Sequence, residues 1–152
     1  MTIVISVLLR LFALIYLFLS ARSDLRTRQV RLLFPCLIAG AAIPVNLLLD
    51  AYPPTDLPYI FGGAAALFLV SFISHSAIGY GDDFVIFACL ALLGPQEELL
   101  CLTCGLLCSA VLSAILLIRR KAGRKDTLPF LPFLFAGHVL VYLICLIRAC
   151  FN

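Results

Sequence analysis

Long apolar runs, separated by short polar loops, constrain the fold of this chain more than any other feature of its sequence. Hydrophobic residues make up 64% of the 152 positions and charged residues 12%, about half the charged share of a soluble domain. Most of the runs approach the roughly 20 residues that a helix needs to cross a bilayer, where backbone groups must bond within the segment. The sequence therefore predicts an all-α polytopic membrane protein with about six transmembrane helices, in a single domain over residues 1–152. The six apolar segments cover about residues 3–20, 32–49, 57–75, 83–95, 98–118 and 128–147.

The basic residues predict how these helices are oriented, because loops rich in Lys and Arg stay in the cytoplasm. We expect a multi-pass protein of the plasma (inner) membrane with its N-terminus outside. The first segment lacks a basic region before it and is not expected to be a cleaved signal peptide. The sequence contains no row of basic residues of the kind that binds nucleic acid, so we expect no nucleic-acid partner. Nine of the eleven basic residues fall in two loops of the same parity, after the first and fifth segments: Arg22, Arg26, Arg28, Arg31, Arg119, Arg120, Lys121, Arg124 and Lys125.

Seven cysteines are present, and most lie within apolar segments, where a thiol serves as a small hydrophobic side chain. The spacing Cys101-x2-Cys104 is compatible with zinc, but a structural zinc site of this type needs a second pair of Cys or His ligands. We therefore expect no metal site, no cofactor and no disulfide framework.

The stretch IGYGDDF, residues 78–84, places two carboxylates at a glycine-rich turn between the third and fourth segments. By the predicted orientation, Asp82 lies at the same membrane face as Asp24, which follows the first segment. Two carboxylates in close proximity share one proton, because both cannot easily ionise. One can then activate water while the other polarises a carbonyl group. The alternative is that Asp82 merely caps the fourth helix.

Several neighbouring positions allow two interpretations each. Gly79 and Gly81 either let the backbone approach a substrate or adopt φ > 0 where the helix begins, and Tyr80 between them is a candidate cleft residue. Asp83 either tunes the pKa of Asp82 or is a second carboxylate at the helix start, and we favour the second. The small residues at 62–66 either permit close helix approach or reflect the ordinary composition of membrane helices.

The remaining polar residues are expected to have ordinary roles. His75 and His138 should be packing residues, because the sequence reveals no partner for either. Asp126 should be a local counterion in the second basic loop. The carboxylates assigned to the outer loops should be solvated: Asp50, Asp56, Glu97 and Glu98.

Three elements, taken together, carry a resemblance to a known family. They are the GxGD motif that ends at Asp82, the segment SARSDLRTRQV that holds Asp24, and the late stretch LPFLPFLFAGHVL, residues 128–140. In this order, and at these membrane positions, the chain resembles the type IV prepilin peptidases, which are membrane aspartyl proteases of the GxGD class. The resemblance covers roughly residues 20–140.

The resemblance implies that Asp24 and Asp82 are the catalytic pair, with Gly79, Tyr80 and Gly81 as motif residues. It implies cleavage of leader peptides from membrane-anchored prepilin-like or pseudopilin-like substrates at the cytoplasmic face. The chain is similar to the short members linked to Flp-type pili, because it lacks the long cysteine-containing first loop of forms that also N-methylate. It departs from the family at residues 30–32, where IPN is usual, and at Phe84, where Lys is usual; Asp83 stands at a usually apolar position.

Two other classes of function remain open. Carboxylates beside glycine-interrupted membrane helices also suit a non-enzymatic proton- or cation-coupled transporter or channel subunit, although the first three segments contain no counterpart of the GxGD motif. An inactive partner in pilus assembly is the third possibility. Motifs of serine hydrolases, zinc proteases and nucleotide-binding loops do not occur in the sequence.

Overall fold

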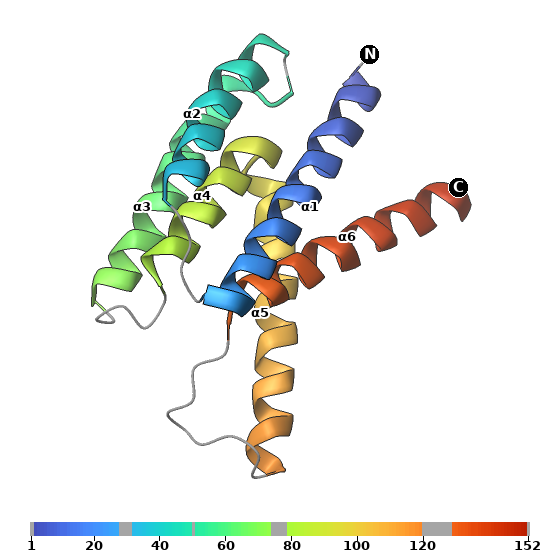
Figure 1. Cartoon of the computed structure of the whole chain (residues 1–152). Coiled ribbons are helices and arrows are strands. Elements are labelled where there is room, and N and C mark those ends of the chain that lie inside the picture. The colour runs from blue at the N-terminus through green and yellow to red at the C-terminus, as the bar shows by residue number, and fades with distance from the viewer. Residues whose placement is uncertain (1, 28–31, 50, 74–78, 120–128, 152) are drawn as a thin grey trace.

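A computed structural model describes residues 2–27, 32–49, 51–73, 79–119 and 129–151 of the chain. The described ranges are mostly helical and contain no strand, which confirms the all-α expectation, and each predicted apolar segment overlaps one helix (Figure 1). The elements are α1 (Thr2–Thr27), α2 (Leu33–Leu48), the 3-10 turn η1 (Pro54–Asp56), α3 (Leu57–Ile73), α4 (Tyr80–Leu93), α5 (Pro95–Ile118) and α6 (Leu131–Phe151).

Three helices are long and apolar enough to span a membrane, fewer than the six that the sequence predicts. The candidate spans are Val4–Arg26, Pro54–Ile73 and Pro95–Ile118. Leu33–Leu48 and Leu131–Ile147 are shorter apolar helices. At 14 residues, α4 is about 21 Å long, whereas the hydrocarbon core measures about 30 Å. The three long apolar helices indicate a membrane-associated protein.

The first helix is longer than its apolar run. Hydropathy predicts an end near residue 20, but α1 continues to Thr27. Residues 21–26 include alanine, leucine and two arginines, which are favourable in a helix, and Arg26 lies in the last turn, where the helix dipole favours a cation. Asp24 is therefore held on a helix rather than in a loop.

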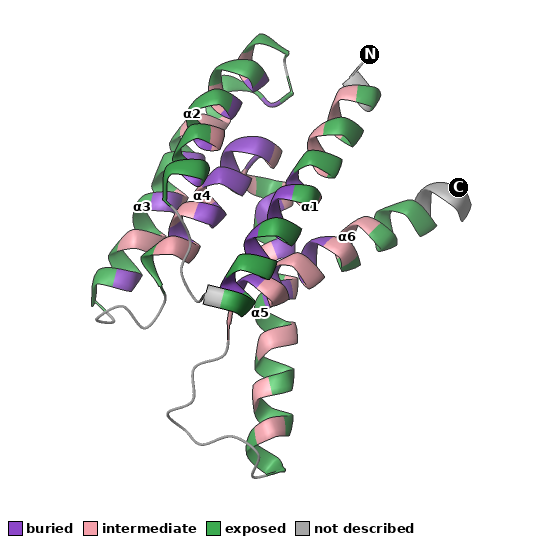
Figure 2. Cartoon of the chain, viewed as in Figure 1, coloured by how far each residue is buried: buried purple, intermediate pink, exposed green. Residues whose placement is uncertain are grey.

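The described helices alternate in direction, and α4 lies among the others (Figure 1). It contacts α1, α2, α3 and α5. Most of its residues are buried, whereas the outward faces of α1, α2 and α3 expose many large apolar side chains (Figure 2). Exposed apolar surface on this scale is typical of contact with lipid. The second halves of α5 and α6 project from the bundle and are mostly exposed or half-buried.

The closest helix contact is between α5 and α6. A Cβ atom added at Gly137 would lie 2.5 Å from the carbonyl oxygen of Cys101 and 2.6 Å from the amide nitrogen of Gly105. Only glycine fits there, because backbone atoms on both helices define the gap. The small-residue face at residues 62–66 is less tightly packed: a Cβ at Gly63 would make ordinary contact with Leu90 of α4, at 3.7 Å, and no described heavy atom lies within 4 Å of a Cβ at Gly62.

The C-terminal end of α4 is buried, and side chains from the α2 region bond to its carbonyl groups. Nδ2 of Asn46 donates to the carbonyl oxygens of Ala91, at 2.8 Å, and Leu92, at 3.1 Å, and the Tyr52 hydroxyl donates to Ala91 at 3.2 Å. The chain then turns at Gly94, whose φ of 84° favours glycine. These bonds satisfy carbonyls that a helix end would otherwise leave unpaired. They fix the position of α4, whose other end carries Asp82.

Candidate functional site

The N-terminus of α4 is formed by the glycine turn. Gly79 is the N-cap residue, with φ −66° and ψ 132° and no side-chain cap. Its carbonyl oxygen accepts hydrogen bonds from the backbone N–H groups of Asp82, at 2.8 Å, and Asp83, at 3.4 Å. Asp82 is thus the third helical residue, not the cap. Gly79 does not adopt positive φ, which among the described glycines occurs at Gly94.

The structure brings Asp24 and Asp82 to the same end of the bundle. Asp24 lies near the C-terminal end of α1 with 8% of its surface exposed, and α1 packs against α4. Burial raises the pKa of Asp82 to about 7, with further contributions from the negative charges of Asp24 and then Asp83. Asp82 lies outside the three candidate spans. Burial and the neighbouring charges therefore favour the protonated form of Asp82 up to near-neutral pH.

Asp83 lies in the first turn of α4, as the favoured interpretation expected, and it is fully buried there. Neither of its carboxylate oxygens meets a hydrogen-bond partner among the described residues. Burial raises the pKa of Asp83, and the nearby Ser71 hydroxyl, which is also buried, limits the rise. The structure therefore gives Asp83 an environment distinct from that of half-buried Asp82, although its charge still acts on the pKa of Asp82.

The motif residues before the pair lie at the rim of the bundle. Tyr80 is 45% exposed, Gly79 is exposed and Gly81 is half-buried. A Cβ at Gly79 would lie 3.7 Å from Oδ2 of Asp82, which is ordinary contact. Glycine at this position therefore leaves one side of the Asp82 carboxylate open to an approaching group.

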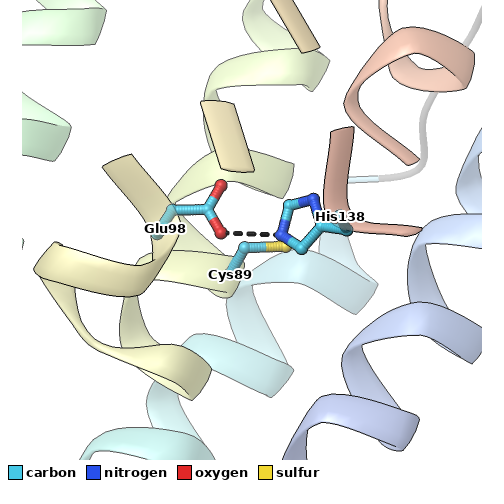
Figure 3. Close-up of side chains that lie close together, drawn as sticks. All are labelled: Cys89, Glu98 and His138. Carbon is cyan, nitrogen blue, oxygen red and sulfur yellow. Dashed lines mark hydrogen bonds and ion pairs between the residues drawn. The ribbon is translucent and has the colours of Figure 1, made fainter. Parts of the chain in front are cut away.

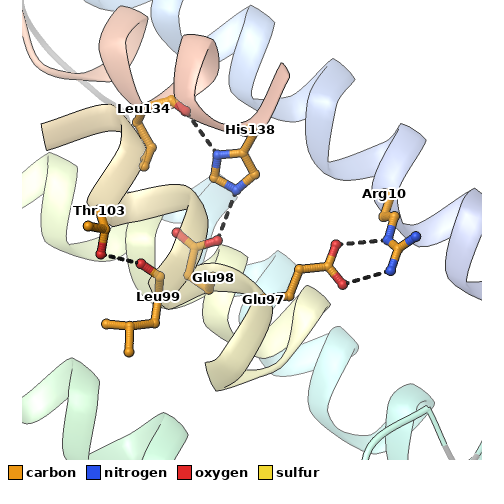
Figure 4. Close-up of polar contacts among 7 residues, drawn as sticks. All are labelled: Arg10, Glu97, Glu98, Leu99, Thr103, Leu134 and His138. Carbon is orange, nitrogen blue, oxygen red and sulfur yellow. Dashed lines mark hydrogen bonds and ion pairs between the residues drawn. The ribbon is translucent and has the colours of Figure 1, made fainter. Parts of the chain in front are cut away.

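The prediction that Glu97 and Glu98 are solvated loop charges is wrong. Pro95 starts α5 directly after Gly94, so both glutamates lie in its first turn. Glu97 forms a two-bond ion pair with Arg10 of α1, with N–O distances of 2.8 and 3.0 Å (Figure 4). The Arg10 guanidinium also lies 5.8 Å from the ring centroid of Tyr142, within range of a cation–π contact.

Glu98 is fully buried and has a partner that the sequence did not reveal. Its Oε2 lies 2.9 Å from Nε2 of His138 on α6, which is also fully buried (Figure 4). His138 is thus more than a packing residue. The sequence could not predict this contact, because Glu98 and His138 are 40 residues apart and no pattern links them.

Of the described Cys, His, Asp and Glu residues, one group could hold a metal ion: Cys89, Glu98 and His138. Cys101 is buried and Cys104 half-buried, but this pair is not part of the group. Asp56 lies in η1 and is half-buried rather than fully solvated. The expectations for Asp50, His75 and Asp126 concern positions outside the described residues.

Comparisons with protein-family models, with curated proteins and with solved structures found no match. The functional conclusion rests on the residues of this chain.

Proposed function

We propose that the chain is a membrane aspartic endopeptidase in which Asp24 and Asp82 are the catalytic pair. The observation that carries the proposal is the placement of buried Asp24 and half-buried Asp82 at the same end of two packed helices. Burial and then the charge of Asp24 raise the pKa of Asp82 to about 7. Ordinary aspartates are ionised at neutral pH. An aspartate that keeps a proton beside a second carboxylate meets the requirement for acid–base hydrolysis of an amide.

In the proposed mechanism the pair holds one proton, and Asp82 carries it in the resting state. Ionised Asp24 removes a proton from a water molecule, and the hydroxide attacks the carbonyl carbon of the scissile peptide. Asp82 donates its proton to the carbonyl oxygen. The C–N bond of the tetrahedral intermediate then breaks as the proton held by Asp24 passes to the leaving amine. The carbonyl re-forms as a carboxyl group, and its proton returns to Asp82.

The proposed substrate is the leader segment of a prepilin-like or pseudopilin-like protein anchored in the membrane by an apolar helix. Two features support it. The pair lies at the N-terminal end of α4, near exposed Arg22 and Arg26 whose charges favour the cytoplasmic face, and exposed apolar faces flank it on the outer helices. A peptide that leaves the membrane at this rim would pass the carboxylates. We propose that this rim faces the cytoplasm, with all six helices contributing to a multi-pass layout.

Co-expression with a prepilin substrate tests the proposal. Cleavage of the leader is followed as a gel shift, and Asp24→Asn and Asp82→Asn should each abolish it while the protein still inserts. Asp56→Asn, at the η1 end of the bundle, is the matched control and should cleave normally. Normal cleavage by Asp82→Asn would overturn the mechanism.

A proton-coupled transporter is the second candidate, and buried Asp83 is the observation that favours it. A carboxylate without a hydrogen-bond partner among the described residues is typical of groups that carry protons through membranes. Proton flux into liposomes that contain the purified protein would separate the two functions: the peptidase should give none, and flux that depends on Asp83 would support transport.

A further inference from the structure

A second cluster of reactive side chains lies deeper in the bundle than the aspartates. Cys89 of α4, Glu98 of α5 and His138 of α6 point toward one another from three helices (Figure 3). All three are 0% exposed, and one ligand atom from each lies within 4.8 Å of the others. Cys89 is seven residues after Asp82, so the cluster lies about 10 Å further along α4.

The hydrogen bonds of His138 determine which ring nitrogen is free. Nδ1 lies 2.9 Å from the carbonyl oxygen of Leu134. A carbonyl can only accept, so Nδ1 carries the hydrogen, and in the neutral ring the lone pair is on Nε2. Nε2 faces both the carboxylate of Glu98, at 2.9 Å, and the thiol of Cys89 (Figure 3). A ring held at one nitrogen by a backbone carbonyl, with the other nitrogen directed at a carboxylate and a thiol, is the usual arrangement of a metal-bound histidine.

The other donors are incompletely used by the protein itself. Oε1 of Glu98 has no hydrogen-bond partner among the described residues, although burial makes an unpaired oxygen costly. Cys89 is one of the free, buried thiols. A dication would bond to the carboxylate, the thiolate and the imidazole at once. Its two positive charges would balance one thiolate and one carboxylate, which leaves no net charge in the low-dielectric interior.

We propose that Cys89, Glu98 and His138 form a binding site for a single Zn²⁺ ion. Thiolate, imidazole and carboxylate together suit zinc, whereas Ca²⁺ and Mg²⁺ prefer oxygen donors alone. Binding displaces two protons, the one on the thiol and the one in the Nε2–Oε2 hydrogen bond, and both are released to solvent as the zinc bonds form. The three protein ligands leave the fourth tetrahedral position to a water molecule, and the fully buried site joins α4, α5 and α6.

The distances are compatible with one ion after small side-chain movements. Zn–S bonds of about 2.3 Å and Zn–N or Zn–O bonds of about 2.0 Å place tetrahedral donors roughly 3.3–3.5 Å apart. To reach these separations, the 2.9 Å distance between Nε2 of His138 and Oε2 of Glu98 must increase slightly. The longest distance between two ligand atoms, which is within 4.8 Å, must decrease by on the order of 1 Å. Rotation of the Cys89 thiol can supply most of the second change. The backbone needs little adjustment, because the tight crossing at Gly105 and Gly137 already holds α5 against α6.

Zinc content of the purified full-length protein tests the site. The protein is isolated in detergent, incubated with Zn²⁺, freed of loosely bound metal and analysed by mass spectrometry of the element. We expect about one zinc per chain, as for a single site with three side-chain ligands. Cys89→Ser and His138→Ala should lower bound zinc about tenfold or more. Cys104→Ser is the matched control and should bind as the wild type does.

A further variant separates metal binding from a purely structural hydrogen bond. Glu98→Gln can donate from its amide to Nε2 of His138 and so preserves the contact while removing the charge. We expect Glu98→Gln to elute from a size-exclusion column as the folded protein does, and to bind about tenfold less zinc per chain. Substitution with Co²⁺ should give a thiolate-to-metal charge-transfer band that is absent in Cys89→Ser.

Two results would overturn the proposal. One is a folded wild-type protein that retains no zinc after incubation. The other is zinc that persists in both Cys89→Ser and His138→Ala but is lost when Cys101 and Cys104 are replaced together. Because the site is distinct from the aspartate pair, Asp82→Asn should keep its zinc, so neither result bears on the peptidase proposal.

Discussion

Asp82 should make both stability and activity depend on pH. Its pKa rises from 3.8 to about 7 on folding, so between these values the folded protein binds more protons than the unfolded chain. The contribution of Asp82 to the free energy of unfolding is therefore fully present below about pH 4 and is lost as the pH rises through 7. Since one pKa unit corresponds to about 1.4 kcal/mol and partial exposure reduces the total, we expect a loss of about 1–2 kcal/mol between pH 4 and pH 8.

Thermal unfolding in detergent at a series of pH values measures this dependence. Asp82→Asn has no group to titrate, so its stability should be flatter over the same range. Leader cleavage by the wild type should fall above pH 7, because Asp82 then loses the proton that it donates. A cleavage rate that keeps rising through pH 9 would contradict the assigned proton.

Asp83 should affect the active pair only through its charge. Asp83→Asn preserves the shape of the buried side chain and removes one of the charges that raise the pKa of Asp82. We expect cleavage within a few-fold of wild type, with the fall in activity at high pH shifted to lower pH. A pH profile of leader cleavage makes the measurement. If Asp83→Asn folds but does not cleave at any pH, Asp83 belongs to the catalytic site.

At the scale of the helices, the α5–α6 crossing should tolerate no side chain at Gly137. In Gly137→Ala the added methyl group meets backbone atoms at 2.5 and 2.6 Å, so the helices must separate. Overpacking of this kind costs about 1–3 kcal/mol. Because His138 is the next residue, we expect the same variant to bind zinc less tightly.

The chain provides a matched control for this glycine. Gly62→Ala adds the same methyl group to α3, where no described atom lies within 4 Å. It should be neutral or slightly stabilising, since alanine favours a helix by up to about 1 kcal/mol over glycine. The melting temperatures of Gly137→Ala and Gly62→Ala, measured in the same detergent, test this difference. Equal melting temperatures would show that the crossing is not close packed.

At the scale of the whole molecule, local sequence patterns predicted the helices. Features that depend on contacts between distant segments could not be predicted from the sequence. Apolar runs identify six helices because hydropathy is a property of neighbouring residues. The length of α1 was missed because residues 21–26 are mostly polar yet compatible with a helix. Burial of Glu98 depends on His138, which is 40 residues away. Asp24 and Asp82 were assigned to one face from loop charges alone, whereas the burial that raises the pKa of Asp82 needed the packed structure.

The location of the two termini distinguishes six membrane passes from three. If all six helices contribute to an alternating layout, an even number of passes places both ends outside. If only the three long apolar helices cross, the ends lie on opposite sides. The short α4 does not exclude the first case, because its C-terminal end is buried in protein, with its carbonyls bonded to Asn46 and Tyr52, and so does not need to reach the membrane surface.

Reporter fusions measure this directly. Alkaline phosphatase is active only outside the cytoplasm, and green fluorescent protein is fluorescent when made inside it. We expect phosphatase activity from fusions at both termini and fluorescence from a fusion after Arg119, at the end of α5. A fusion after Pro53, before η1, also separates the two layouts: it should show phosphatase activity with six passes and fluorescence with three. Fluorescence at one terminus and phosphatase activity at the other would indicate an odd number of passes, as when only the three long helices cross. The basic ends of α1 and α5 would then be separated by two crossings and would still lie on the same face of the membrane.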